Sequence, residues 1–109
     1  MRILITGGRT FKDWQLMCQV LDDFKPTVII QGGARGADMM ARQYANSRKI
    51  PRITYDYLSY LGRAGGPARN SFMVKDSRAD LCVAFPGGRG TQDCANNARA
   101  QGIKTVVVP

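Results

Sequence analysis

Ile3-Leu4-Ile5-Thr6-Gly7-Gly8-Arg9 is a short apolar run that ends in a glycine-rich turn. Two more turns of this kind follow apolar runs later in the chain, Gly32-Gly33-Ala34-Arg35-Gly36 and Pro86-Gly87-Gly88-Arg89-Gly90-Thr91. Each of the three turns contains an arginine and precedes a segment whose apolar residues recur at helical spacing. Repetition of strand, turn and helix is typical of an α/β domain built on a parallel sheet.

The rest of the chain continues this alternation. Trp14, Met17 and Leu21 recur at helical spacing, which predicts that they face the core together. Thr91 is a good N-cap for the last helix, and Gly102 is suited to end it. Residues 56–66 show no regular period. The predicted strands are 3–5, 27–30, 53–55, 81–85 and 105–108, and the predicted helices are 13–24, 37–45, 68–77 and 91–101.

These elements predict one domain over residues 1–109. Nearly uninterrupted apolar strands are typical of a parallel sheet that helices cover on both faces. Right-handed crossovers then favour a three-layer, Rossmann-like, doubly wound α/β fold with five parallel strands in the order 3-2-1-4-5. In this order strands 1 and 4 are neighbours where the winding reverses. Ligands of such folds bind at the carboxyl ends of the strands there, so the three turns predict one shared pocket.

The composition narrows the possible chemistry. The chain has 16 Lys and Arg against 8 acidic residues, a net charge of +8, and most of the cations are arginine. This balance suits an anionic partner such as a nucleotide or nucleic acid. The chain has no His and no Glu, which excludes Ser-His-Asp and Cys-His catalysis within it. The absence of His also argues against a His/Cys zinc site, and we expect neither a metal nor a cofactor.

Cysteine usage and hydropathy bear on the compartment. Cys18, Cys82 and Cys94 are odd in number and widely spaced, so we expect buried free thiols. No apolar run approaches the roughly 18 residues of a membrane span. The first apolar stretch is too short for a signal peptide. We therefore expect a cytoplasmic protein without a membrane partner.

The glycine-rich turns predict a phosphate site. A glycine pair lets backbone N–H groups approach a ligand that a Cβ would hold away, and a following helix directs its free amides and positive dipole end to the same place. An arginine adds a planar set of donors that matches phosphate. The predicted ligand-binding residues are Thr6, Gly7, Gly8, Arg9, Gly32, Gly33, Arg35, Gly36, Asp38, Arg69, Asn70, Pro86, Gly87, Gly88, Arg89, Gly90 and Thr91.

Several of these side chains have two interpretations. Asp38 either stabilises the start of its helix or forms a hydrogen bond to a ribose hydroxyl or to Arg35. Asp93 either stabilises the first turn of the last helix or serves as a general base or an oxocarbenium-stabilising carboxylate. The tyrosines at positions 55, 57 and 60 either are partly buried or stack on a base.

Two common nucleotide fingerprints are missing. No G-x-x-x-x-G-K-[ST] motif occurs, which argues against a P-loop NTPase. No G-x-G-x-x-G follows the first strand, and the second strand ends in Gln31 where an NAD-binding domain has an acid. The sequence therefore does not indicate a dinucleotide-dependent dehydrogenase.

The residues instead resemble the SLOG superfamily, which includes the Lonely Guy phosphoribohydrolases, the DNA-processing protein DprA and the YspA/YpsA-like proteins. The resemblance is strongest to the YspA-like branch. It rests on four blocks that keep their order and cover nearly the whole chain, Thr6–Arg9, Gly32–Asp38, Gly66–Asn70 and Phe85–Thr91. It implies a Rossmann-related fold that binds nucleotides or nucleotide-derived signals at the glycine turns.

The resemblance is weaker for catalysis. Lonely Guy enzymes carry P-G-G-x-G-T-x-x-E, whose Glu serves N-glycosidic cleavage of a nucleoside 5′-monophosphate together with an Arg. Arg69 falls where that Arg is expected, but Cys94 stands at the Glu position and Asp93 precedes it. One residue along a helix turns the side chain by about 100°, so Asp93 does not simply replace the Glu.

Three functions therefore remain open. The first is the sensing or sequestration of a nucleotide or nucleotide-derived small molecule, with a homodimer as the expected assembly. The second is N-glycosidic hydrolysis of a nucleoside 5′-monophosphate, with Asp93 and Arg69 as catalytic residues. The third is single-stranded nucleic-acid binding, which the DprA resemblance and the positive charge allow.

Overall fold

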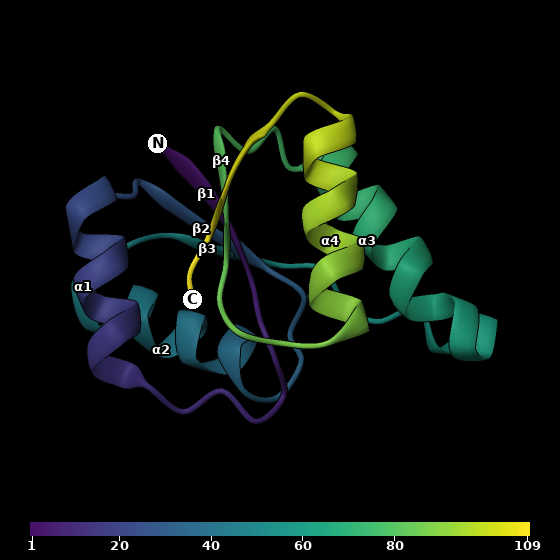
Figure 1. The fold of residues 1–109 in the computed structure, drawn as a ribbon, viewed down its shortest axis with the longest axis horizontal. Helices are drawn as coiled ribbons and strands as arrows, with labels where there is room; N and C mark the ends of the chain where they lie inside the picture. The colour runs from purple at the N-terminus through teal and green to yellow at the C-terminus, as the bar shows by residue number, and fades with distance from the viewer.

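The computed structural model describes all residues from 1 to 109. Figure 1 shows three layers, with α1 and α2 on one side of a central sheet and α3 and α4 on the other. All strand pairs are parallel, in the order β3-β2-β1-β4-β5, which confirms the predicted fold class and topology. The elements are β1 (Arg2–Thr6), α1 (Trp14–Phe24), β2 (Val28–Gln31), α2 (Ala37–Arg48), β3 (Arg52–Thr54), the 3-10 helix η1 (Ser59–Ala64), α3 (Gly65–Asp76), β4 (Leu81–Ala84), α4 (Arg89–Ala100) and β5 (Lys104–Val107).

The two faces of the sheet bury separate sets of side chains. Ile3 and Ile5 of β1 belong to a cluster that includes Leu21 of α1 and side chains of α2. Leu4, between them, belongs to a second cluster with Met73 of α3 and side chains of α4. Successive side chains of a strand point to opposite faces, so a strand covered on both faces must be apolar at every position. This requirement explains the uninterrupted apolar runs of the central strands.

Two predictions about the helices were wrong. Trp14 is 38% exposed, because it is the first residue of α1 and only later turns of the helix, at Met17 and Leu21, reach the core. Thr91 is not an N-cap, because Gly88 takes the non-helical cap conformation and α4 begins at Arg89. The C-terminal prediction is confirmed, since α4 is followed by Gly102 with a φ of +76°.

The structure also changes the limits of some elements. β2 extends to Gln31, and β3 has only three residues, so Tyr55 lies outside it. Residues 56–66 are not irregular throughout, since they include η1 and the start of α3. Cys82 and Cys94 are buried free thiols as predicted, whereas Cys18 is only partly buried. None of the helices has the length and apolar character that crossing a membrane requires.

Candidate functional site

The turns after β1 and β4 are joined backbone to backbone. Beyond the last paired residues of the two strands, the Phe85 N–H donates to the Thr6 carbonyl oxygen at 2.9 Å. The Gly8 N–H then donates to the Pro86 carbonyl oxygen at 2.8 Å. These bonds continue the pairing of the strands past their carboxyl ends. The first and third glycine-rich turns are therefore held directly beside each other.

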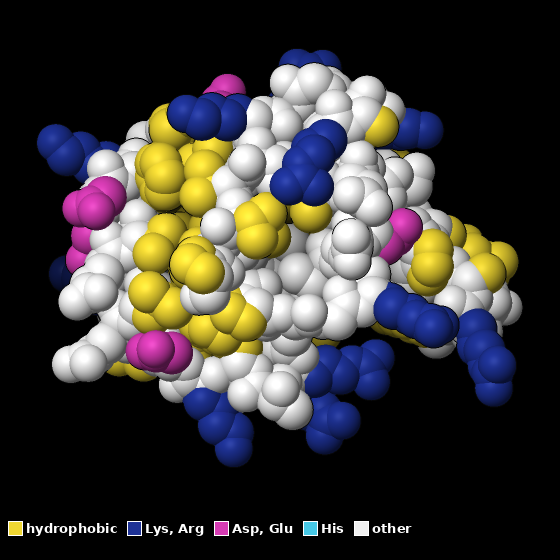
Figure 2. All heavy atoms as spheres, viewed as in Figure 1, with side chains coloured by type: hydrophobic (Ala, Val, Ile, Leu, Met, Phe, Trp, Pro, Cys, Tyr) yellow, Lys and Arg dark blue, Asp and Glu magenta, His cyan; other side chains and the backbone are white.

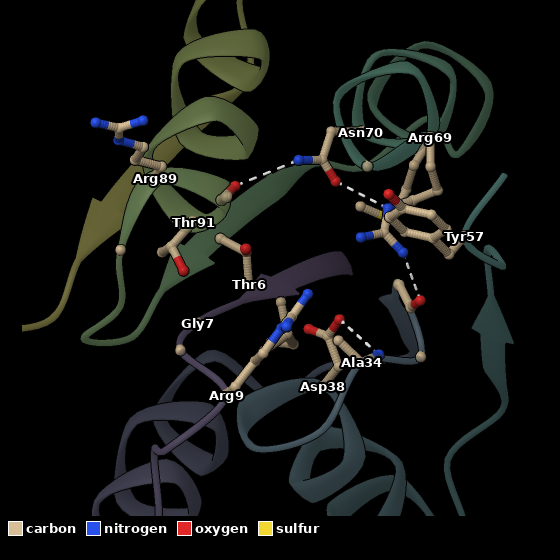
Figure 3. A pocket seen from close by; sticks show the side chains of 18 of the residues that line it. Thr6, Gly7, Arg9, Ala34, Asp38, Tyr57, Arg69, Asn70, Arg89 and Thr91 are labelled. Atoms are coloured by element: carbon tan, nitrogen blue, oxygen red, sulfur yellow. Dashed lines mark hydrogen bonds between the residues drawn. The ribbon is translucent and has the colours of Figure 1, made fainter. Parts of the chain in front are cut away.

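A cavity of about 620 Å³ opens at this edge of the sheet. It is the main candidate site, and its side chains come from the ends of β1 and β2 and the starts of α2, α3 and α4 (Figure 3). The structure brings most of the predicted residues into its wall. These are Thr6, Gly7, Gly8, Arg9, Gly32, Gly33, Asp38, Arg69, Asn70, Gly88, Arg89, Gly90 and Thr91.

The N-terminus of α4 presents free amides to this cavity. No side chain caps the helix, and the N–H groups of Arg89, Gly90 and Thr91 donate to no acceptor in the protein. Among the glycines of the three turns, only Gly88 and Gly90 have no atom within 4 Å of the place where a Cβ would lie. Unpaired amides beside open space are the arrangement that binds anions at helix N-termini.

The second glycine-rich turn has a different role from the one that the sequence predicts. Arg35 and Gly36 do not line the cavity. A Cβ on Gly36 would overlap the Gly8 carbonyl oxygen and the Arg9 backbone. The Ala37 N–H, which would otherwise be free at the start of α2, donates to the Gly8 carbonyl oxygen at 3.1 Å. This turn therefore supports the first turn, and the first amide of its helix is used within the protein.

Arg69 is held by the protein on two of its three nitrogens. Its Nη1 donates to the carbonyl oxygens of Gly32 at 2.5 Å and Tyr55 at 3.1 Å, and its Nε donates to Asn70 Oδ1 at 2.9 Å. A Cβ on Gly32 would overlap the guanidinium, so this glycine makes room for the arginine. Nη2 forms no hydrogen bond in the protein and is the donor that Arg69 has left for a ligand.

Arg9 and Arg89 are exposed and form no side-chain hydrogen bond or ion pair, so both are free to contact an anion. In Figure 3 the Arg9 side chain extends toward Asp38, whereas Arg89 extends away from the other labelled side chains. Figure 2 shows Lys and Arg side chains along the lower edge of the molecule, where the turns after β1 and β4 lie in Figure 1.

Asp38 is a buried carboxyl group in the wall of the cavity, only 7% exposed. Burial raises its pKa to about 6, although the Ala34 N–H and the charge of Arg69 act in the opposite direction. The Ala34 N–H donates to Asp38 Oδ2 at 3.2 Å, which orients the group. A carboxyl group with a pKa near 6 can exchange a proton close to neutral pH.

The structure does not bring Asp93 into the cavity wall. Its Oδ2 accepts a hydrogen bond from Asn70 Nδ2 at 3.0 Å, and Asn70 is itself buried. Cys94, at the position of the Lonely Guy Glu, is fully buried. The pair of Asp93 and Asn70 therefore links α4 to α3, and the carboxylates in the cavity wall are Asp38 and Asp56.

The predicted ligand-binding residues leave out several residues of the cavity, although Tyr57 is one of the tyrosines considered for stacking on a base. Asp56, Tyr57 and Gly66 line it, and Tyr57 and Gly66 are in close contact, since a Cβ on the glycine would lie 3.2 Å from Tyr57 Cε2. Gln31 acts from outside the wall, because its Oε1 accepts the Gly33 N–H at 2.6 Å. The signal for Asp56 and Tyr57 was their place directly after β3, at the same edge of the sheet as the glycine turns.

The three tyrosines near this edge differ in position. Tyr57 lines the cavity, and its hydroxyl donates to the Gly62 carbonyl oxygen at 2.6 Å. Tyr55 instead donates to Asp76 Oδ2 at 2.6 Å and packs edge-on against Phe72. Tyr60 is 81% exposed and does not line the cavity. Of the three, only Tyr57 therefore lies where a base could stack on it. The structure contains no group of three or more His, Cys, Asp or Glu side chains that could hold a metal ion.

Comparison with known proteins gives two matches. The family model of the YspA, cpYpsA-related SLOG family (YAcAr) matches residues 1–57. This part of the chain contains the first two glycine-rich turns and ends at Tyr57 of the cavity wall. The Gene 61 protein of Mycobacterium phage D29 is 35% identical to the chain, in an alignment that covers 96% of this chain and 94% of the phage protein.

Proposed function

The chain belongs to the YspA, cpYpsA-related SLOG family, and from this we propose that it binds a nucleotide or a nucleotide-derived small molecule in the cavity at the carboxyl edge of the sheet. The observation that carries the proposal is the start of α4, where three unpaired amides and two glycines with open space face the cavity. Neither neighbouring atoms nor a positive φ requires glycine at positions 88 and 90. Close approach of a ligand phosphate is a reason for their lack of side chains.

Other residues of the cavity wall suit the remainder of a nucleotide. Asp38 and Asp56 offer carboxylate oxygens that accept hydrogen bonds from ribose hydroxyls or base amino groups. Tyr57 offers an aromatic face. In this arrangement Arg9 and the α4 amides neutralise the phosphate, while Asp38 addresses the ribose.

The test of this proposal is Gly90→Ala. A methyl group there projects into the cavity wall and separates the phosphate from the amides, so we expect at least a tenfold loss of nucleotide affinity. The fold should be unharmed, because alanine is favoured over glycine in a helix by up to about 1 kcal/mol. The measurement combines calorimetric titration with the four ribonucleoside 5′-monophosphates and 5′-diphosphates and a thermal melt without ligand.

The matched control is Gln92→Ala, on the exposed side of the same helix and outside the cavity. It should bind nucleotides like the wild type. Equal nucleotide affinity of Gly90→Ala and the wild type would contradict the proposed phosphate site. Binding of short single-stranded DNA with a steep salt dependence, without binding of any mononucleotide, would assign the function to nucleic acid instead.

A second function, hydrolysis of an N-glycosidic bond, is favoured by one observation. Asp38 is a buried carboxyl group in the cavity wall with a pKa of about 6, so it is better placed than Asp93 for acid–base work. Incubation with nucleoside 5′-monophosphates should then release free base, detected by chromatography, and Asp38→Asn should abolish the release. If no base is released at any pH from 5 to 8, the protein is a binder without this activity.

A further inference from the structure

A second hollow lies beside the candidate cavity, on the other side of the first glycine-rich turn. It has a volume of about 650 Å³ and is lined by residues 8–12 and 86–88. It therefore lies between the segment that leads from β1 into α1 and the segment that leads from β4 into α4. Nothing in the proposed binding of a single phosphate makes use of it.

The two spaces share a low ridge. Gly8, Arg9 and Gly88 line both of them. Contact between the two turns explains glycine at position 8, because a Cβ there would lie 2.9 Å from the Pro86 carbonyl oxygen. No such contact explains Gly88, which has open space around its missing Cβ and a φ of −104°. The absence of a side chain at Gly88 therefore leaves room for a ligand to pass from the cavity into the hollow.

The hollow has the charge of an anion subsite. Arg9 lines both spaces and Lys12 lines only the hollow, and both are exposed without a side-chain hydrogen bond or ion pair. No carboxylate lines the hollow. The nearest acidic residue in sequence, Asp13, is engaged as the N-cap of α1, where Oδ1 accepts the Leu16 N–H at 3.0 Å. The hollow therefore differs from the cavity, whose wall contains Asp38 and Asp56.

We propose that this hollow binds a second phosphate of the same ligand, so that the protein prefers ligands with two phosphates, either joined directly as in a nucleoside 5′-diphosphate or separated by a nucleoside as at the end of a strand. The inference rests on the proposed function. The first phosphate lies at the α4 amides, the ligand passes Gly88, and the second phosphate is bound by Lys12. Arg9, which lines both spaces, contacts both phosphates. Charge-assisted hydrogen bonds of this kind supply both affinity and selectivity for the longer anion.

The test compares ligands that differ by one phosphate. Calorimetric titration at constant ionic strength uses the four ribonucleoside 5′-monophosphates, the corresponding 5′-diphosphates and the 5′-phosphorylated dinucleotides. We expect the 5′-diphosphate to bind roughly tenfold more tightly than the monophosphate of the same base, which is about 1.4 kcal/mol. Lys12→Gln should remove this gain and leave the monophosphate affinity within about twofold of the wild type, because Lys12 lies outside the cavity.

The matched control is Lys104→Gln, an equal change of charge at an exposed residue. Lys104 begins β5 and so lies at the amino ends of the strands, away from the hollow at their carboxyl ends. Lys104→Gln should change neither the monophosphate affinity nor the diphosphate affinity. A dinucleotide that binds more tightly than the diphosphate, with a gain that Lys12→Gln removes, would identify the end of a nucleic-acid strand as the source of the second phosphate. A diphosphate that binds as tightly as the dinucleotide would identify a free nucleotide.

Two results would overturn the inference and leave the proposed function intact. One is equal affinity of the wild type for monophosphates and for both kinds of extended ligand. The other is a Lys12→Gln variant that weakens mono- and diphosphates by the same factor. Failure of every nucleotide to bind the wild type would refute the proposed function and, with it, the second phosphate site.

Discussion

Gly36→Ala is expected to lower the free energy of unfolding by about 3 kcal/mol, which corresponds to a fall of more than about 10 °C in the melting temperature of a domain of this size. Gly36 has a φ of 79° and a ψ of −123°, a conformation that favours glycine. A Cβ there would also meet the backbone of the first turn, with the Arg9 carbonyl carbon only 2.6 Å away. Neither the chain at Gly36 nor the turn at Gly8–Arg9 can move without breaking the bond between the Ala37 N–H and the Gly8 carbonyl oxygen.

The measurement is chemical and thermal denaturation of the variant beside Gly102→Ala. Gly102 has nearly the same φ, +76°, but no atom within 4 Å of its missing Cβ. Gly102→Ala should therefore show only the conformational cost of a positive φ, about 1 kcal/mol. The difference between the two variants reports the contact between the first and second turns. Equal losses of stability in the two variants would show that this contact does not matter.

Asp38→Asn is expected to make the protein more stable at neutral pH, by up to about 3 kcal/mol. The pKa of Asp38 is about 6 in the folded state, whereas the unfolded chain releases this proton near the ordinary carboxyl pKa of 3.8. Between these values the folded state binds more protons, so the stability contributed by this group falls as the pH rises from about 4 to about 6. Asparagine is neutral at every pH and still offers an oxygen to the Ala34 N–H.

The measurement is the free energy of unfolding of the wild type and the variant from pH 4 to pH 8. The gain should be largest at pH 7 and above and should approach zero at pH 4. Asp23→Asn, which changes an exposed carboxylate of α1, is the control and should show no such gain. An Asp38→Asn variant that is less stable than the wild type at pH 7 would mean that the ionised carboxylate is needed by the fold.

Gly36→Ala should lower the free energy of unfolding and Asp38→Asn should raise it at neutral pH. The two substitutions therefore distinguish a residue that the fold requires from one that it does not. Gly36 is required by the packing of the turns. Asp38 reduces the stability of the folded chain at neutral pH and yet faces the cavity. A group that costs stability at such a position is typical of a site kept for function.

Local sequence patterns were enough to predict the fold and the edge of the sheet at which the candidate cavity opens. Apolar runs such as Ile3–Ile5 are legible because a strand covered on both faces must be apolar at every position. The glycine turns mark the ends of β1, β2 and β4, and the parallel order then brings these ends together. The strands and turns follow from local sequence patterns, and the order of the strands follows from the few ways in which parallel strands can be connected.

Which turn keeps free backbone amides depends on the folded structure. The three glycine-rich turns look alike in sequence, but the amides of α4 are free while the Ala37 amide of α2 is used by Gly8. In the same way Asp93 is turned to Asn70, and Asp56 and Tyr57 enter the cavity from the short strand β3. Each of these outcomes depends on contacts between segments that are distant in sequence. A local sequence pattern therefore cannot predict which backbone N–H and C=O groups are paired in such contacts and which remain free.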